Sequence, residues 1–463
     1  MLVVYVLIYT VANANISLPA VICSNMVLQQ KSSVKLWGWG GPTEKVIITT
    51  SWNNKTDSTK VDENAKWQIA LETPTAGGPY TITIKGNNTI VLQNILIGEV
   101  WICSGQSNME MSYYWGLPQM KADLPTAFNP NIRFFTAAKT TALSPQENNR
   151  GDWVVCDSAT VKSFSAIGYY FGRKLNADLN VPIGLINVSW GGTPAEVWTP
   201  AEIINSDSLL KSKAKKISRS SGWPITPGYT YNGMIAPIIP YVIAGAIWYQ
   251  GEGNTEIAST YHPLFTTMIN AWRDKWNSQF PFYYVQLAPF KYGNKNIAAL
   301  LREAQTKTLA LAKTGMVVTT DLVDDTMDIH PKNKKDVGLR LAAIALTDTY
   351  NKTVPGAKSP LYKSMKVDKE KVTLTFDNLS TGLMTKGGPA IGFYIAGADK
   401  IFYPAQVKIA ADKVVVWSKV VANPVAVRYA FSNTAVGNIF SKEGLPLSPF
   451  RTDDWPVDSS PDK

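Results

Sequence analysis

The chain of 463 residues contains little histidine and cysteine, two of the former and three of the latter. Cys23, Cys103 and Cys156 form no CxxC pair, which argues against a zinc site or a dithiol redox motif. Charged residues account for only 17% of the chain and hydrophobic residues for 45%, a composition that predicts packed cores rather than disorder. At roughly 100–200 residues per domain, the length corresponds to about two to four domains. We expect no metal and no cofactor.

The sequence also lacks a long apolar run. Residues 1–14 are apolar but too short to span a membrane, and they end in Ala12-Asn13-Ala14, which fits a signal-peptide cleavage site. The basic start usual for such a signal is missing, and a buried first strand is the alternative interpretation. We expect a signal peptide at 1–14, no membrane span, and therefore an exported protein, periplasmic or secreted.

A concentrated block of one charge is absent as well. The net charge is +10, but the basic residues are scattered, and the densest run, at 211–216, is short and lies in a Ser-rich stretch. A solvated loop explains this run better than a nucleic-acid surface does. We expect no nucleic-acid partner, and the sequence does not indicate an oligomeric state.

What is present divides the chain into three zones. Residues 15–97 contain short β-rich runs, such as 34–39 and 45–50, separated by turns rich in Gly, Asn and Pro, which is typical of a small β-sandwich. Residues 98–352 alternate apolar strands with helical segments and predict a mostly parallel sheet. The strands are expected at 100–103, 183–188, 244–249, 282–287 and 316–320, and the helices at 166–179, 260–276, 298–312 and 334–347. Residues 353–463 return to β-like runs.

Polar turns follow four of these strands. In an open α/β sheet, ligands bind at the carboxyl ends of the strands, so the turns at 104–109, 189–194, 250–254 and 328–331 should meet at one edge. The polar stretch 206–228 lacks clean periodicity and is expected to be a surface insertion near this site.

These turns contain the parts of an acyl-transfer site. Ser107 follows a strand, where its hydroxyl is exposed, and a serine nucleophile needs a base that accepts its proton. His330 lies in a loop after the fifth strand and fits this role better than His262, which begins a helical segment. Asp328 is the nearest candidate to orient His330, although Asp321, Asp324, Asp325 or a backbone carbonyl could do so.

An acyl-transfer reaction also needs donors for the developing oxyanion, each worth roughly 2.7–4 kcal/mol. The Ser107 N–H, one N–H of the pair Gly191-Gly192, and the side-chain amide of Gln250 are the candidates. Weaker candidates for substrate binding are Trp190, Glu252 and Arg302. A cysteine hydrolase using Cys103 is a rival interpretation, although a buried packing thiol is the default role there.

Four blocks in order resemble the SGNH hydrolases, specifically the sialate O-acetylesterase branch. They are Gly-Gln-Ser-Asn-Met at 105–109, Gly-Gly-Thr-Pro-Ala-Glu-Val-Trp at 191–198, Trp-Tyr-Gln-Gly-Glu at 248–252 and Asp-Ile-His-Pro at 328–331. The resemblance implies a flavodoxin-like, three-layer α/β catalytic domain with flanking β-sandwich-like regions. It also implies Ser107 as nucleophile, His330 as base, and Ser107, Gly192 and Gln250 as the oxyanion hole.

The chain departs from the broader superfamily in two places. The asparagine usual in the third block is replaced by Gln250. The acid normally stands three residues before the histidine, a position that Met327 occupies here, with Asp328 one residue closer. The GxSxG elbow of the α/β-hydrolases is absent, since Met109 stands where its second glycine would be.

The hypothesis is therefore a serine esterase that hydrolyses O-acetyl esters on sugars, with O-acetylated sialic acid as the first candidate substrate. An esterase for acetylxylan or another polysaccharide would use the same residues on a different sugar. A non-catalytic carbohydrate-binding protein, with the β regions as binding modules, is the alternative from another class.

Overall fold

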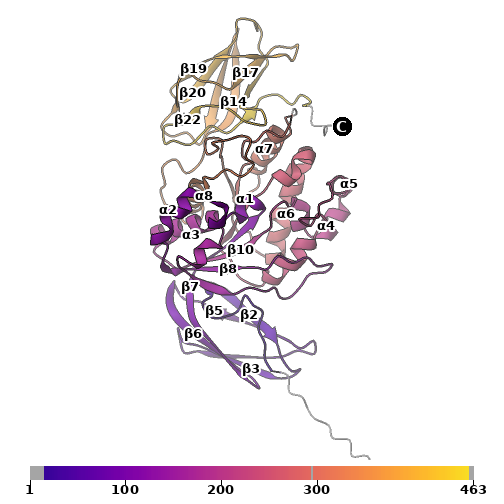
Figure 1. Cartoon of the computed structure of the whole chain (residues 1–463), viewed down its shortest axis with the longest axis vertical. Helices are drawn as coiled ribbons and strands as arrows, with labels where there is room; N and C mark the ends of the chain where they lie inside the picture. The colour runs from indigo at the N-terminus through magenta and orange to yellow at the C-terminus, as the bar shows by residue number, and fades with distance from the viewer. Residues whose placement is uncertain (1–14, 294–295, 458–463) are drawn as a thin grey trace, which may run out of the picture.

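The computed structural model describes residues 15–293 and 296–457. The predicted signal peptide lies outside these residues. Three regions follow one another along the long axis of the molecule, a β region at each end and an α/β region between them (Figure 1). None of the helices in the described ranges has the length and apolar character that crossing a bilayer requires.

The α/β region is built on a central sheet with the strand order β13-β12-β11-β7-β10-β8-β9. All neighbours run parallel except β8 and β9, which are antiparallel. This confirms the predicted mixed α/β architecture with a mostly parallel sheet. The strands are β7 (Thr89–Gly105), β8 (Asn129–Thr136), β9 (Trp153–Cys156), β10 (Ile183–Ser189), β11 (Gly245–Tyr249), β12 (Phe282–Val285) and β13 (Thr314–Val317).

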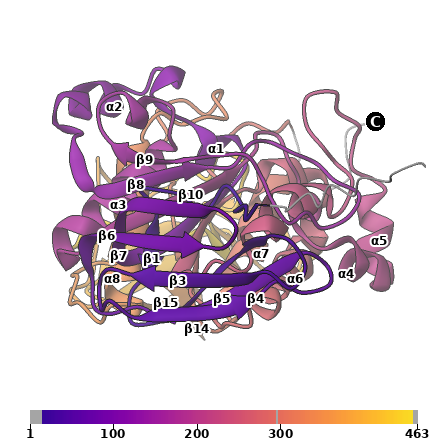
Figure 2. The same cartoon turned by 90° about the horizontal axis from the view of Figure 1, so that it is seen from below.

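Helices cover both faces of this sheet (Figures 1 and 2). They are α1 (Ser107–Glu110), α2 (Pro118–Asp123), α3 (Ala166–Leu179), α4 (Ala201–Ser206), α5 (Ser208–Ala214), α6 (Tyr261–Trp276), α7 (Ile297–Thr308) and α8 (Lys334–Asp348). Side chains alternate along β7, so that Trp101 and Cys103 pack in the core beneath α3 and α8, while Val100 and Ile102 pack in the core beneath α6. The result is a three-layer arrangement.

The central strand β7 belongs to two sheets. Its first part pairs antiparallel with β6 in the N-terminal region, with Ile84 opposite Ile90. Its last part pairs parallel with β10 and β11 in the central sheet, up to Gly105. One unbroken strand therefore connects the N-terminal β region to the middle of the α/β region.

The remaining N-terminal strands form two small sheets. β2 pairs with β5, while β3 pairs with β4 and β6, and β1 runs parallel to β7. Their bounds are β1 (Val27–Gln29), β2 (Ser33–Trp39), β3 (Lys45–Thr50), β4 (Thr56–Lys60), β5 (Lys66–Glu72) and β6 (Gly77–Lys85).

The C-terminal region is antiparallel throughout and has its own hydrophobic core. Its two larger sheets have the orders β14-β15-β20-β19 and β18-β17-β21-β23, and β16 pairs with β22. The strands are β14 (Leu361–Asp368), β15 (Lys371–Asp377), β16 (Leu383–Thr385), β17 (Phe393–Ala396), β18 (Phe402–Pro404), β19 (Gln406–Ala410), β20 (Lys413–Trp417), β21 (Ala426–Tyr429), β22 (Ile439–Ser441) and β23 (Phe450–Arg451). The expected flanking β regions are present at both ends.

Candidate active site

Ser107 stands at a sharp turn between β7 and α1. Gly105 closes the strand with φ of +131°, and a Cβ at this position would lie 2.2 Å from the carbonyl oxygen of Tyr249. Only glycine tolerates this combination of backbone angle and close approach. The turn carries Ser107 past the end of the sheet, where the residue is 8% exposed.

His330 meets Ser107 from the loop between β13 and α8. Its Nε2 lies 2.9 Å from Ser107 Oγ, within hydrogen-bond distance, although the two residues are 223 positions apart in sequence. Trp115 packs edge-on against the imidazole with ring centroids 5.2 Å apart. The other histidine, His262, contacts the Thr308 hydroxyl at 3.2 Å and lies on α6.

The surroundings of His330 favour its neutral form. Burial lowers the pKa of the imidazole, and the nearby ammonium of Lys334 lowers it further. Asp328 acts in the opposite direction, while Lys332 adds to the lowering. A neutral imidazole whose Nε2 faces a hydroxyl is the form that accepts a proton in general base catalysis.

Asp328 contacts the main chain of His330 rather than its ring. Its Oδ1 accepts a hydrogen bond from the His330 backbone N–H at 2.8 Å, and its Oδ2 lies 3.5 Å from Lys332 Nζ. In the described ranges, no side chain bonds to Nδ1 of the imidazole. Asp321 is engaged elsewhere, in a two-bond ion pair with Arg340. The contact of Asp328 therefore fixes the loop that holds the imidazole.

The two candidate glycines differ in their hydrogen bonding. Gly191 donates its N–H to Glu110 Oε2 at 2.6 Å, so this donor is occupied. Across the described part of the chain, neither the Gly192 N–H nor the Ser107 N–H has an acceptor. Gly192 adopts φ of +79°. These two free donors sit on the turns that follow β10 and β7.

The side-chain amide of Gln250 is occupied by the protein itself. Its Nε2 donates to Asn254 Oδ1 at 2.7 Å and to the Thr193 carbonyl at 3.3 Å, and its Oε1 accepts from the Tyr261 hydroxyl. Asn254 in turn donates to Glu196, whose pKa burial raises to about 7. In this geometry the Gln250 amide joins the turns after β10 and β11, and both of its hydrogens are donated to protein acceptors.

A buried network behind Ser107 was not anticipated from the sequence. Asn108 accepts a hydrogen bond from Lys334 Nζ at 2.6 Å and donates to Glu252 Oε1 at 2.5 Å and to the Ile329 carbonyl at 3.1 Å. Burial lowers the pKa of Lys334 to about 7 and raises the pKa of Glu252. The one indication of this network in the sequence is Lys334, four residues after His330, but only the fold shows that its side chain points inward.

The predicted insertion 206–228 does lie beside the site. Its Trp223 packs on Gly192 so closely that a Cβ there would lie 2.2 Å from the indole ring. Trp223, Gly192 and Glu252 are among the residues that line a cavity of about 180 Å³. Trp190 lies on the same turn as Gly192, with Lys139 Nζ 5.8 Å from its ring centroid.

Arg302 is placed differently from the sequence expectation. It is fully buried, and its guanidinium donates to four main-chain carbonyls, those of Leu287, Ala288, Ser432 and Asn433. These bonds join α7 and the segment after β12 to the C-terminal β region. The geometry gives Arg302 a structural contact in place of the predicted substrate contact.

Cys103, the nucleophile of the rival interpretation, is also unsuited to catalysis. The residue is fully buried in β7, and burial raises the pKa of its thiol. A thiol held in its protonated form by an apolar environment is a poor nucleophile, so the structure gives no support to the cysteine-hydrolase interpretation.

Comparisons of this chain with protein families, with known sequences and with solved structures all indicate carbohydrate acetylesterases. Residues 97–347 match the family described as carbohydrate esterase, sialic acid-specific acetylesterase. The sialate O-acetylesterase of Rattus norvegicus is 28% identical over 418 residues, which cover 76% of this chain and 77% of that protein. The sialate O-acetylesterase of Homo sapiens is 30% identical over 356 residues, covering 69% and 68%. The crystal structure of a carbohydrate acetylesterase from Xanthomonas citri aligns with a TM-score of 0.87 at 37% identity, covering 95% of this chain and all (100%) of that one.

A serine hydroxyl facing an imidazole at the carboxyl edge of a parallel α/β sheet is the arrangement of a hydrolase that transfers acyl groups. The family match covers more than half of the chain and makes the assignment specific. The chain belongs to the sialic acid-specific acetylesterase family of carbohydrate esterases, and it is a carbohydrate O-acetylesterase.

Proposed function

We propose that Ser107 is the nucleophile of this esterase and His330 its base, in an active site of the SGNH type. The observation that carries the proposal is the 2.9 Å contact between Ser107 Oγ and His330 Nε2. His330 takes the hydroxyl proton as Oγ attacks the acetyl carbonyl carbon, and then gives that proton to the departing sugar oxygen. The same imidazole then takes a proton from water as the water oxygen attacks the acetyl carbonyl carbon. It returns this proton to Ser107 Oγ as the bond from Oγ to the acetyl carbon breaks and acetate leaves.

The developing oxyanion is bound by the N–H groups of Ser107 and Gly192, since both are free in the structure. Gln250 becomes a third donor only when one of its bonds, to Asn254 or to Thr193, is exchanged for the substrate. Asp328 contributes by holding the His330 main chain.

The substrate we propose is an O-acetyl ester on sialic acid, and the family description and the sialate O-acetylesterases among the relatives support this choice. An acetylated polysaccharide such as xylan is the second candidate, because the Xanthomonas citri neighbour is described only as a carbohydrate acetylesterase. We place the enzyme outside the cytoplasm, on the strength of the apolar segment that ends in Ala12-Asn13-Ala14.

Replacing the nucleophile tests the mechanism. We expect Ser107→Ala to lower kcat for 4-nitrophenyl acetate by on the order of a thousandfold or more, because no other group forms the acetyl intermediate. The matched control is Cys103→Ala, four positions earlier on β7, which should keep its activity. Hydrolysis by the Ser107→Ala variant at more than a few per cent of the original rate would contradict the assignment.

The sugar is decided by a direct comparison. Acetate release from O-acetylated sialic acid and from acetylated xylan is measured with the same enzyme preparation, and we expect the higher kcat/KM with the sialic acid ester. A preference for xylan would leave the mechanism intact and replace the substrate.

A further inference from the structure

The sheet formed by β2 and β5 carries two tryptophans on an unexpected face. Side chains alternate along a strand, and residues directly opposite each other in a pair share a face. Leu36 lies on one face of this sheet, whereas Trp37 and Trp39 lie on the other, opposite Gln68 and Lys66 respectively. The outward face of such a sheet usually carries polar residues, so two neighbouring indoles there need a partner.

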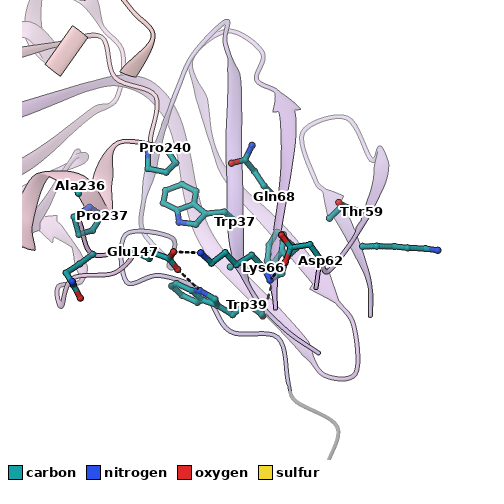
Figure 3. A pocket seen from close by; sticks show the side chains of 14 residues that line it. Trp37, Trp39, Thr59, Asp62, Lys66, Gln68, Glu147, Ala236, Pro237 and Pro240 are labelled. Carbon is teal, nitrogen blue, oxygen red and sulfur yellow. Dashed lines mark hydrogen bonds and ion pairs between the residues drawn. The ribbon is translucent and has the colours of Figure 1, made fainter. Parts of the chain in front are cut away.

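The α/β region supplies an opposing wall. Pro237 and Pro240, together with Glu147 from the loop after β8, face the two indoles across a cavity of about 550 Å³ (Figure 3). This volume lies within the range of small-molecule sites, which occur preferentially where two domains meet. We call this cavity the indole cleft.

The two indoles have different environments. Trp37 is 9% exposed and packs edge-on against Tyr241 with centroids 6.5 Å apart, so docking of the two regions accounts for it. Trp39 is only partly buried. Its Nε1 donates to Glu147 Oε2 at 3.2 Å, and Glu147 also pairs with Lys66 (Figure 3). Docking of the regions therefore orients Trp39 through Glu147 but leaves its indole only partly covered.

The ion pair between Lys66 and Glu147 contributes little to stability. Their side chains are 48% and 52% exposed, and pairs this exposed to solvent are typically worth about 0–1 kcal/mol. Its clear effect is to fix the indole of Trp39 in place, which reduces the entropy that a ligand must overcome on binding.

The free polar groups of the indole cleft suit hydroxyl groups. In the part of the chain that the structure describes, the Gln68 amide and the Thr59 hydroxyl have no hydrogen-bond partner. The charges of the lining balance, with Lys60 and Lys66 against Asp62 and Glu147. A pyranose ring presents apolar C–H groups on its face and hydroxyls at its rim, which match an indole surrounded by amide and hydroxyl groups.

We propose that the indole cleft is a second carbohydrate site that binds uncharged pyranose units of a glycan. It goes beyond the proposed esterase function, because binding there breaks no bond and needs neither Ser107 nor His330. Balanced charge favours neutral sugars over acidic ones, and the junction of two regions gives the cleft its second wall.

Calorimetric titration with xylohexaose tests the proposal, using the full-length Ser107→Ala protein so that the catalytic nucleophile is absent. We expect binding, and a dissociation constant on the order of tenfold weaker in the Trp39→Ala derivative, a loss that corresponds to one stacked aromatic contact. Lys35→Ala is the matched control, because Lys35 lies on the same face of β2 but does not line the cleft. Gln68→Ala, at an exposed position without a partner, provides a second variant that leaves the fold unchanged.

Three results would overturn the proposal: no binding of xylohexaose, equal binding by the Trp39→Ala and Lys35→Ala derivatives, or tighter binding of sialyllactose than of xylohexaose. In proteins that retain Ser107, we expect Trp39→Ala to hydrolyse 4-nitrophenyl acetate at the unchanged rate. If the unsubstituted protein showed no esterase activity, the proposed function would be refuted, but the binding of xylohexaose would still stand. Failure of the proposed function and failure of the second-site proposal are therefore distinguishable.

Discussion

At the scale of single residues, Asn108 joins three turns that come from distant parts of the sequence. Its amide receives a hydrogen bond from Lys334 and donates to Glu252 and to the Ile329 carbonyl, one residue before His330. The ammonium, the amide and the carboxylate thus form a continuous buried chain of hydrogen bonds. Hydrogen bonds in a low-dielectric interior are electrostatically stronger than in water, so this chain restrains the side chains that it joins. We infer that this network sets the position of His330 relative to Ser107.

The lowered pKa of His330 predicts the acidic limit of activity. An unperturbed histidine has a pKa of about 6.5, and burial together with Lys334 lowers it here. The active form is the neutral imidazole, so kcat/KM should stay at its plateau below pH 6.5 and fall only as the pH passes the lowered pKa. A pH–rate profile with 4-nitrophenyl acetate measures this limit, and a midpoint above 6.5 would contradict it.

Replacing Lys334 should move the same limit. Lys334→Met removes a charge that lowers the His330 pKa, so we expect the acidic limb of kcat/KM to shift to higher pH. Lys335→Met is the matched control, because Lys335 pairs with Asp123 at 2.8 Å and does not act on the imidazole. If both variants kept the original midpoint, Lys334 would have only a structural role.

Residue types were easier to predict from the sequence than their contacts. Ser107 and His330 were singled out because a hydroxyl nucleophile needs a base and only two histidines exist. The contacts of Asp328 and Gln250 depend on which neighbouring loop comes within hydrogen-bond distance. That is decided by tertiary packing, which a local pattern does not contain.

At the scale of elements, α3 shows how its ends are fixed. Ser165 accepts a hydrogen bond from the Gly168 N–H at its start, and Asn180 adopts the left-handed conformation at its end. The same serine hydroxyl donates to the Met109 carbonyl at 2.6 Å. One side chain therefore begins α3 and ties it to α1, the helix that carries Ser107.

Removing this hydroxyl should weaken both contacts. We expect Ser165→Ala to lower the free energy of unfolding by about 1–2 kcal/mol, the usual cost of losing a helix cap. Urea denaturation measures the change, with Ser163→Ala as control because Ser163 is exposed. An unchanged unfolding midpoint in Ser165→Ala would show that the cap is dispensable.

The bounds predicted from the sequence agree with the structure for some elements better than for others. The predicted helix 166–179 has the bounds of α3, because an apolar stripe, a capping serine and a terminal asparagine coincide there. The predicted strand 282–287 is longer than β12 (Phe282–Val285). The two residues beyond the observed strand, Gln286 and Leu287, are buried, as strand residues are. The end of a strand, however, is set by its hydrogen bonds to neighbouring strands, and no single segment of sequence contains that information.

At the scale of the whole molecule, two arginines connect the α/β region to the C-terminal β region. Arg302 reaches the carbonyls of Ser432 and Asn433, and Arg451 on β23 forms two hydrogen bonds with Glu303 on α7. Both contacts are largely buried, and removing one partner of a buried contact is strongly destabilising because the other is left uncompensated. The two regions should unfold as one unit.

Arg302→Ala tests this connection. Its loss leaves the carbonyls of Leu287, Ala288 and Ser432 without a donor, and each unsatisfied group costs roughly 1–3 kcal/mol. The Asn433 carbonyl keeps the Phe290 N–H as a donor. We expect a stability loss of about 3 kcal/mol or more in thermal or urea unfolding, while KM for a soluble acetyl ester stays unchanged in the folded fraction. A raised KM with normal stability would restore the original expectation of a substrate contact.

Because β7 belongs to two sheets, its two parts acquire their neighbouring strands at different times during synthesis of the chain. A ribosome adds roughly 5–20 residues per second, so β6 and the first part of β7 can pair on the order of ten seconds before β11 has been synthesised. Until β10 has been synthesised, the second part of β7, with Trp101 and Ile102, has neither of its parallel neighbours, and β11 is added only later. The growing chain therefore displays an apolar strand edge that only later synthesis covers. Proteolysis of nascent chains stalled between β9 and β10 should find this segment sensitive, and chains stalled after β11 should protect it.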